Sequence, residues 1–437
     1  MIIDDNVETN DLELLTEPAS RVSAMAGALI GSEILKIASD IRSLVAAGHS
    51  VCNLTVGDFS PAQFRIPMML EDAIVESIRA GETNYPPSDG VAPLRRAVVE
   101  FYQRRLGLTY PVESVLVTGG SRPGIYATYR AVVDAGDRVV YPVPTWNNNH
   151  YCHLVGAVGV PVACGSADNF LPTGQRLRES LRGARLLALN SPLNPTGTAF
   201  TPQQLAEVCD AVLEENARRS PQERPLYLMY DQVYWMLTFG EVLHVNPVAL
   251  RPAMQPYTIF VDGISKAFAA TGVRVGWTVG PEDITHRMAS FIGHVGAWAP
   301  RAEQLATAKL LANDAAMDQF HATMRHGVEG RLRALYDGME LLRSSGLPVE
   351  TIAPMGAIYL SVRFPVNGMQ TPDGATLATN EQIRHYLLQA SGIAIVPFQA
   401  FGMTEESGWF RLSVGAVSLD DIAAMLPRLR QALAGLR

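Results

Sequence analysis

The stretch DGISKAFAATGVRVGW, residues 262–277, places a lysine just after an apolar run and an arginine eight positions later. This lysine stands out because the chain has only three, Lys36, Lys266 and Lys309, among 35 lysine and arginine residues. Arginine keeps its proton in proteins, whereas a lysine amine can lose its proton and act as a nucleophile. Chemistry that needs a side-chain amine therefore has three candidates in this sequence.

The surroundings of the three lysines differ. Lys36 lies within GSEILKIASDIRSLV and Lys309 within LATAKLLAN, and both patterns predict helices with a solvated ammonium group. Lys266 instead follows YTIFVDG, an apolar run typical of a buried strand. Side chains just past the ends of such strands are common sites of chemistry. Lys266 is therefore the candidate for a reactive amine.

Composition limits the class of function. A chain of 437 residues with 48% hydrophobic and 18% charged residues predicts a globular protein with a large and a smaller domain. The net charge of −8 argues against nucleic acid as a partner, because phosphates require clustered positive charge. No apolar run approaches the roughly twenty residues of a membrane helix, so we expect no membrane partner. A small-molecule substrate is the expectation.

The N-terminal region and the cysteines indicate a compartment. Six acidic residues precede the first basic residue, Arg21, which is the opposite of a secretory or mitochondrial leader. The four cysteines form no C-x-x-C pair and have no ligand-like spacing with histidine. We therefore expect a cytoplasmic protein without a structural metal site, in which residues 1–22 form an acidic tail.

Apolar runs alternate with helical patterns between about residues 113 and 280. The strand-like runs are SVLVTGG, DRVVYPVP, GVPVACG, RLLALNSP, PLYLMYDQ, YTIFVDG and WTVGP. Continuous apolar strands separated by helices predict an α/β fold, with a mostly parallel sheet covered by helices on both faces. From residue 350 the short strands AIYLSVRF and GWFRLSVGA occur with two helical patterns, which predict a smaller α+β domain. We place the large domain at 67–311 and the small domain at 23–66 together with 312–437.

The glycine-rich segment VTGGSRPGIY, residues 117–126, follows one of these strands and opens a helix. Exposed amides at a helix start bind phosphate groups. A short-chain dehydrogenase has a similar loop, but it needs glycines where Pro123 and Tyr126 stand, and a Y-x-x-x-K pair that this chain lacks. An ordinary strand-to-helix turn explains a lone loop of this kind equally well. The other polar clusters must decide between the two.

Four further clusters follow predicted strands in a characteristic order. They are Trp146 in YPVPTW, Asn194 in NSPLNPTG, Asp231 and Tyr234 in YDQVY, and Lys266 with Arg274 in the opening stretch. Each alone has a structural explanation, such as a core position, a turn or a helix cap. Together they resemble the class I and II aminotransferases, which are pyridoxal-phosphate enzymes of fold type I. The resemblance extends from about residue 53 to residue 420.

The resemblance implies how the cofactor ring is held. Lys266 would form the Schiff base with the aldehyde of pyridoxal 5'-phosphate. Asp231 would keep the pyridine nitrogen protonated, which the cofactor needs as an electron sink. Tyr234 and Asn194 would bond the phenolic oxygen of the ring, and Trp146 would stack on its face.

The resemblance also implies a phosphate cup. Arg274 would supply positive charge to it. Its further donors would be Ser265, Ser121 and the backbone amides of Gly120 to Arg122. Tyr85, in NYPPSDG, resembles a family tyrosine that reaches the phosphate of the other subunit, which implies a homodimer. Gly263 departs from the pattern, because many relatives have a serine there that contributes one more phosphate contact.

The substrates implied are an amino acid and a 2-oxo acid that exchange an amino group in two half-reactions. Arg411, in GWFRLS, would bind the α-carboxylate with its two-pronged guanidinium, with Gly57 and Asn194 alongside. Lys266, once freed, would move the α-proton as general base and acid. FIGHVGAWAP, residues 291–300, has no arginine where dicarboxylate-specific relatives often have one. We therefore expect a neutral side chain, with His294 and Trp298 lining its pocket.

Other functions share parts of this pattern. Lyases, synthases and oxidases of fold type I use the same cofactor set, and motifs do not separate them from aminotransferases. Cofactor-sensing transcription regulators belong to another class, but they need a DNA-binding module that the short acidic N-terminal region does not supply. The sequence does not identify the amino donor, the amino acceptor or the metabolic pathway.

Overall fold

The computed structural model describes residues 21–29 and 33–437. The chain divides into two compact units, Met1–Gly31 and Ser32–Arg437. In the first unit, the described residues form the short helix α1 (Ala24–Gly27), capped by the hydroxyl of Ser23. Most of the predicted acidic tail, residues 1–20, lies outside the described residues. The features below belong to the second unit.

The largest sheet of the described residues has seven strands in the order β2-β8-β7-β6-β5-β3-β4. Strands β4, β3, β5, β6 and β7 pair in parallel, whereas β8 runs antiparallel to both of its neighbours, β7 and β2. The bounds are β2 (Val115–Thr118), β3 (Arg138–Val143), β4 (Val158–Ala163), β5 (Ala184–Asn190), β6 (Tyr227–Asp231), β7 (Thr258–Gly263) and β8 (Gly276–Val279). Each strand falls on one of the apolar runs of the sequence.

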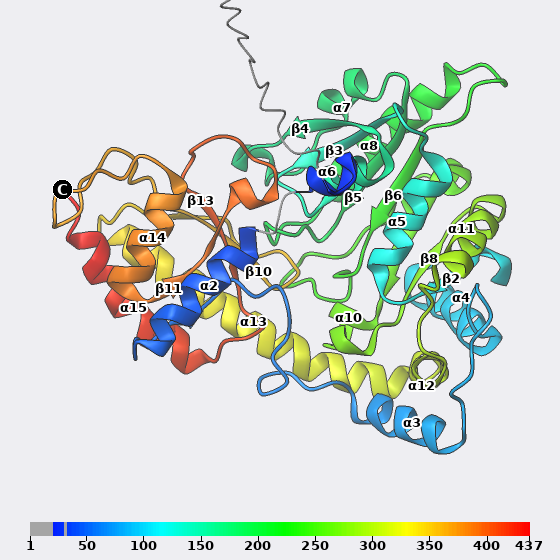
Figure 1. Ribbon diagram of the computed structural model, residues 1–437, viewed down its shortest axis with the longest axis horizontal. Helices are drawn as coiled ribbons and strands as arrows, with labels where there is room; N and C mark the ends of the chain where they lie inside the picture. Colours follow the sequence, from blue (N-terminus) through cyan, green and yellow to red (C-terminus); the bar gives the residue numbers. More distant parts are fainter. Residues whose placement is uncertain (1–20, 30–32) are drawn as a thin grey trace, which may run out of the picture. The chain divides into compact units, whose positions relative to one another are not determined.

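Both faces of this sheet are buried by helices (Figure 1). In β5, Leu186 and Ala188 pack with α5 (Ser121–Val132) and α6 (Asn148–Val155), while Leu187 and Leu189 pack with α4 (Ala92–Leu106) and α8 (Pro202–Ala217). Successive strand residues point to opposite faces, so a strand covered on both sides must be apolar throughout. The predicted fold class, α/β with a mostly parallel sheet, is confirmed.

A second sheet is built from the C-terminal third. Its strand order is β12-β13-β10-β9, and all its pairs are antiparallel. The bounds are β9 (Glu350–Thr351), β10 (Tyr359–Arg363), β12 (Val396–Pro397) and β13 (Trp409–Ser413), with α14 (Asn380–Ser391) and α15 (Leu419–Ala434) nearby in the chain. The long helix α13 (Asp314–Ser344), yellow in Figure 1, contacts α12 (Arg301–Leu311) as well as β9, β10 and α15. It therefore links the two sheets.

An N-terminal segment attaches to this C-terminal part. Helix α2 (Glu33–Ala46) carries Asp40, whose carboxylate lies 2.8 Å from the guanidinium of Arg384 on α14. Strand β1 (Cys52–Asn53) pairs in parallel with β11 (Ile393–Ala394). These contacts join α2 and β1 to the C-terminal third, whereas residues 23–31 belong to the first unit. The grouping of residues 23–66 with 312–437, and the boundaries of both domains, stay a prediction. The remaining α-helices are α3 (Met68–Arg79), α7 (Gly174–Ser180), α9 (Pro247–Leu250), α10 (Ile264–Ala267) and α11 (Glu282–Val295).

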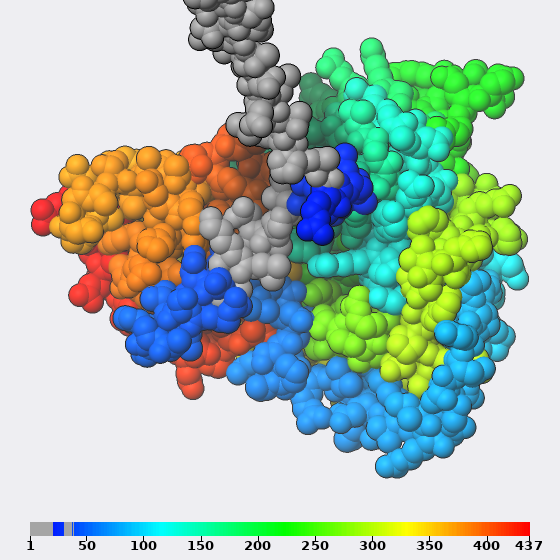
Figure 2. All heavy atoms as spheres, viewed as in Figure 1, coloured from blue at the N-terminus to red at the C-terminus, as the bar shows by residue number. Residues whose placement is uncertain are grey.

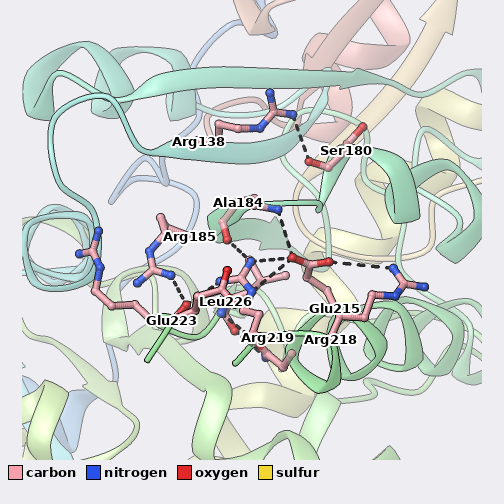
Figure 3. Close-up of polar contacts among 12 residues, drawn as sticks. Arg138, Ser180, Ala184, Arg185, Glu215, Arg218, Arg219, Glu223 and Leu226 are labelled. Carbon is pink, nitrogen blue, oxygen red and sulfur yellow. Dashed lines mark hydrogen bonds and ion pairs between the residues drawn. The ribbon is translucent and has the colours of Figure 1, made fainter. Parts of the chain in front are cut away.

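A cluster of polar and charged residues lies where β3 and β5 begin (Figure 3). Arg219, on the turn after α8, donates to the carbonyl oxygen of Ala184 at 2.6 Å and to the carboxylate of Glu215 at 2.9 Å. The same carboxylate accepts from the amide of Gly183 at 3.1 Å. Both charged side chains are buried, so each charge depends on these partners. The amino ends of β3 and β5 are thus satisfied by this buried ion pair and its hydrogen bonds.

The described residues contain neither a membrane-spanning helix nor a metal-binding cluster. No helix in residues 21–29 and 33–437 is both long and apolar enough to cross a membrane. No group of three or more histidine, cysteine or acidic side chains in the same ranges is arranged to hold a metal ion. The four cysteines are buried and free, and burial raises the pKa of each thiol to about 12.

Candidate active site

A cavity of about 550 Å³ opens where β5, β6 and β7 end. The predicted site residues that line it come from segments far apart in the sequence. They are Gly57, Ser121, Arg122, Trp146, Asn194, Asp231, Tyr234, Ser265, Lys266, Arg274 and Arg411. The remaining lining residues are Asp58, Ile125, Asn190, Val233, Thr271, Gly272 and Tyr359. The fold therefore gathers nearly all of the predicted residues around one space.

Lys266 lies on the short helix α10, three residues after β7 ends. Its Nζ donates to the carbonyl oxygen of Gly57 at 2.6 Å. Burial lowers the pKa of the Lys266 amine to about 8, and the guanidinium of Arg411 pushes in the same direction, while the carboxylate of Asp58 opposes both. The cavity thus makes an amine that loses its proton far more readily than an ordinary lysine.

Asp231 ends β6, beside the predicted lysine. Burial raises the pKa of its carboxyl to about 7, whereas the amide of Val233 and the charge of Lys266 lower it. None of the described residues places a cationic nitrogen within ion-pair distance of Asp231, so a positive ring nitrogen would supply the missing partner. Asn190, at the end of β5, donates to the carbonyl oxygen of Asp231 at 2.9 Å.

A set of donors suited to phosphate lies where α5 begins. The guanidinium of Arg274 donates to the carbonyl oxygens of Thr271 at 2.7 Å and Gly119 at 3.0 Å. Gly120 has a φ of 88°, and a Cβ there would stand 2.2 Å from Nη2 of Arg274, so only glycine permits this approach. The amide of Gly120 donates to the carbonyl oxygen of Thr118 at 2.7 Å, so of the three predicted amide donors those of Ser121 and Arg122, at the start of α5, remain for a ligand. The first amides of a helix and a fixed guanidinium are the donors that a phosphate group needs.

Gly263 lacks space for the serine that many relatives have. A Cβ at this position would lie 2.8 Å from Cα of Gly276 and 2.9 Å from the carbonyl oxygen of Val275. Strand β8 thus packs directly on the backbone that leads to Lys266. The nearby hydroxyl of Ser121 donates to the carbonyl oxygen of Asp262 at 3.0 Å. Close backbone packing explains the departure from the family pattern.

Arg411 is a buried cation of β13, with a relative exposure of 1%. It donates to the carbonyl oxygen of Thr55 at 2.7 Å and to Oδ1 of Asn194 at 3.1 Å. Its guanidinium stacks between the rings of Tyr359 and Phe401, 4.8 Å from each centroid. No carboxylate of the described residues neutralises it, which suits a site for a substrate carboxylate.

Trp146, Tyr234 and Ser265 also line the cavity. Trp146 is half-buried, and the guanidinium of Arg122 lies 5.2 Å from its ring. The hydroxyl of Tyr234 lies 2.6 Å from that of Tyr359. Ser265 lines the wall next to Lys266.

Three predictions fall elsewhere within this chain. Tyr85 is 82% exposed and stacks edge-on against Trp298, with ring centroids 5.5 Å apart. Neither it nor Trp298 lines the cavity, and His294 is exposed at the end of α11. Lys309 forms an exposed ion pair with Glu76, as expected for a solvated helix position, whereas the side chain of Lys36 lies outside the described residues.

Sequence reasoning missed several lining residues. Asp58 directly follows Gly57, and Asn190 ends an apolar run four residues before Asn194, so their neighbours gave a signal for both. Tyr359 lies inside the strand-like run AIYLSVRF, where an aromatic residue predicts a core position. Only the pairing of β10 with β13 brings it to Arg411.

Comparison with known proteins agrees with this geometry. The family model "Aminotransferase class I and II" matches residues 49–429. The chain belongs to the class I and II aminotransferase family. A relative from Geobacillus stearothermophilus, named aspartate aminotransferase, is 28% identical over 94% of this chain and 98% of its own length.

Solved structures of aminotransferases have the same fold. An aspartate aminotransferase from Rhizobium meliloti superposes with a TM-score of 0.87 at 26% identity, covering 96% of this chain and all of the other. An aromatic aminotransferase from Pyrococcus horikoshii OT3 gives a TM-score of 0.78 at 26% identity, covering 91% and 98%. The protein is a pyridoxal-phosphate-dependent aminotransferase of fold type I that uses amino acid and 2-oxo acid substrates. Lyase, synthase and oxidase functions are not favoured.

Lys266 is the predicted site of cofactor capture, and its pKa predicts how the rate of capture depends on pH. Only the neutral amine adds to an aldehyde, so the rate of capture by the cofactor-free protein should rise with pH and level off above a midpoint near 8. Borohydride trapping of bound pyridoxal phosphate, followed by peptide mapping, measures this rate. Lys266→Arg should abolish trapping, and Lys309→Arg should leave it unchanged. A midpoint at the ordinary lysine value of 10.5 would contradict the burial of this amine.

Proposed function

We propose that the cavity lined by Lys266, Asp231 and Arg411 is the active site of this aminotransferase. The observation that supports it most is the lowered pKa of Lys266, an amine held against Gly57 in a cavity with three guanidinium groups. When bound, pyridoxal phosphate supplies an electron sink that stabilises negative charge at the α-carbon of the substrate. The residue roles that follow belong to the same proposal.

The side chains divide the work according to their chemistry. Arg411 binds the α-carboxylate, which fixes the amino acid with its α-hydrogen toward Lys266. The Lys266 amine accepts this proton and later delivers it, which its pKa of about 8 permits near neutral pH. Asp231 holds a proton on the ring nitrogen of the cofactor, and Arg274 with the start of α5 binds the phosphate. The two half-reactions use the same residues in opposite directions.

A half-reaction tests this proposal. Protein loaded with pyridoxal phosphate and given one amino acid without acceptor should release one oxo acid per site and keep the nitrogen as the amino form of the cofactor. Lys266→Ala should slow this by at least about a hundredfold, because it removes the general base. Lys309→Ala, which removes an exposed lysine, is the matched control. Release of ammonia or peroxide, or wild-type speed in Lys266→Ala, would refute the proposal.

We also propose that the working unit is a homodimer in which Tyr85 reaches the cofactor phosphate of the other subunit. Tyr85 is 82% exposed and does not line the cavity of its own chain. The preceding helix α3, on the surface in Figure 2, exposes the apolar side chains of Met68, Val75 and Ile78. Several exposed apolar side chains on one helix, followed in the sequence by an exposed tyrosine, are typical of a subunit interface.

Hybrid dimers test the reach of Tyr85. Tyr85→Ala should weaken cofactor binding about tenfold or more, because a hydrogen bond to a charged group is lost. When Tyr85→Ala chains are mixed with Lys266→Ala chains, each hybrid dimer should have one active site. That site combines Lys266 of the Tyr85→Ala chain with Tyr85 of the Lys266→Ala chain. Turnover after mixing and sedimentation of the wild type measure both points. A monomeric wild type, or no recovery in the hybrid, would contradict the proposal.

The amino donor could have either of two classes of side chain, neutral or acidic. The sequence-based expectation of a neutral side chain stays a prediction, and the aromatic aminotransferase among the similar structures is compatible with it. A specific observation favours an acidic side chain. Arg122 lines the cavity and has no carboxylate of the described residues within ion-pair distance, while Arg274 and Arg411 are assigned to the phosphate and the α-carboxylate. Arg122 is therefore left to bind a second substrate carboxylate.

Arg122→Gln separates the two candidates. If the donor is acidic, this variant should lose about ten- to a hundredfold in kcat/KM for aspartate, because one charge-assisted hydrogen bond is lost, and little for phenylalanine. Arg130→Gln removes an exposed charge of the same helix and is the matched control. If wild type prefers phenylalanine and Arg122→Gln affects both donors equally, the neutral candidate holds.

A cytoplasmic location remains part of the proposal. It is supported by the free, buried state of all four cysteines, which a reducing compartment maintains. Fractionation of the source cells with an antibody to the protein tests it.

A further inference from the structure

Tyr359 contacts two of the residues assigned to the site and lies close to a third. It begins β10 and is fully buried, yet it lines the cavity. Its hydroxyl lies 2.6 Å from the hydroxyl of Tyr234, and the guanidinium of Arg411 stacks 4.8 Å from its ring centroid. A Cβ on Gly57 would approach the same hydroxyl to 3.1 Å. One side chain thus adjoins both the substrate carboxylate site and the tyrosine assigned to the cofactor ring.

We propose that Tyr359 is a positioning residue whose hydroxyl donates to Tyr234 and whose ring orients Arg411. This inference rests on the proposed function, because it assigns Tyr234 to the phenolic oxygen of the cofactor and Arg411 to the α-carboxylate. The inference adds that Tyr359 connects Tyr234, through a hydrogen bond, with Arg411, through ring stacking. Tyr359 acts through its neighbours and needs no contact with a reacting atom.

The direction of the hydrogen bond follows from donor counting. Two hydroxyl oxygens 2.6 Å apart share one proton, and each tyrosine has a single proton to donate. Tyr234 can donate to the cofactor only if Tyr359 is the donor between the two. Burial raises the pKa of both hydroxyls, so both remain neutral in the working pH range and keep their protons for hydrogen bonding.

The link has a chemical consequence at Tyr234. A hydroxyl that accepts one hydrogen bond becomes a stronger donor for the next, particularly away from water. Tyr359 therefore strengthens the bond from Tyr234 to the phenolic oxygen and fixes its direction. The ring of Tyr359 has a separate task, because together with Phe401 it sandwiches the guanidinium of Arg411 and prevents it from turning.

Two tyrosine-to-phenylalanine variants and their combination test the hydroxyl. The visible absorbance band of the cofactor bound to Lys266 changes with pH. A donor to the phenolic oxygen favours the high-pH form, which carries more negative charge on that oxygen. Tyr234→Phe should therefore raise the pH midpoint, and Tyr359→Phe should raise it by a smaller amount. The double variant should match Tyr234→Phe, because Tyr359 acts through Tyr234.

Controls separate this effect from a general disturbance of the fold. Tyr386→Phe removes a half-buried hydroxyl that bonds the carbonyl oxygen of Ala432 at 2.7 Å, and it should leave the midpoint unchanged. Incorporating 3-fluorotyrosine at position 359 keeps the shape and gives a more acidic donor, so the midpoint should fall. This second substitution also serves if Tyr359→Phe does not fold.

The ring is tested by carboxylate binding. Tyr359→Phe keeps the ring and should leave the Kd of a competing substrate-like carboxylate within about twofold, whereas Tyr359→Leu should weaken it about tenfold. A midpoint in Tyr359→Phe equal to that of wild type, or a shift that adds fully to that of Tyr234→Phe, overturns the proposal. A wild-type protein with no pH-dependent band would instead overturn the assignment of Lys266 and Tyr234 themselves.

Discussion

The arrangement of the site depends on the burial of one amine among fixed positive charges. An ammonium group taken out of water is costly, and the guanidiniums of Arg411, Arg122 and Arg274 add repulsion, so Lys266 gives up its proton at about pH 8. Arginine cannot respond in this way, because its guanidinium remains charged under the same conditions. A chain with three lysines among 35 basic residues therefore has permanent charges for binding anions and, in Lys266, an amine that can exchange its proton.

The charged residues of the fold differ between the two ends of the parallel strands. Ion pairs such as Arg219 with Glu215 satisfy the amino ends, where charge only stabilises structure. At the carboxyl ends, Asp231 ends β6 and Lys266 follows β7, and neither has an ion-pair partner among the described residues. Unpaired buried charges are costly to the fold, and their presence at one edge is the physical sign of a site that binds charged molecules.

Sequence patterns were sufficient where a residue directly follows a strand of the large sheet. The apolar runs predicted β5, β6 and β7, and the polar residues after them, from Asn194 to Lys266, reached one cavity as expected. The sequence pattern was insufficient where a tertiary contact determines whether a residue reaches the cavity. Tyr359 belongs to a different sheet and has the periodicity of a core residue, so no local signal separates it from its buried neighbours. Tyr85 is exposed in a single chain, and its proposed role depends on a surface that one sequence does not define.

Gly263 shows how packing and ligand binding compete for the same space. Strand β8 approaches so closely at Gly276 that a side chain at position 263 would collide with backbone atoms. A serine donor there would require β8 to move away, and the same movement would disturb Gly120 and Ser121, because a Cβ on Gly276 would stand 2.5 Å from the backbone of both. The start of α5 is the part of the proposed cup whose first amides would bind a phosphate. A glycine at position 263 therefore preserves the position of Gly120 and Ser121, which explains why it can stand at this place in the proposed phosphate-binding site.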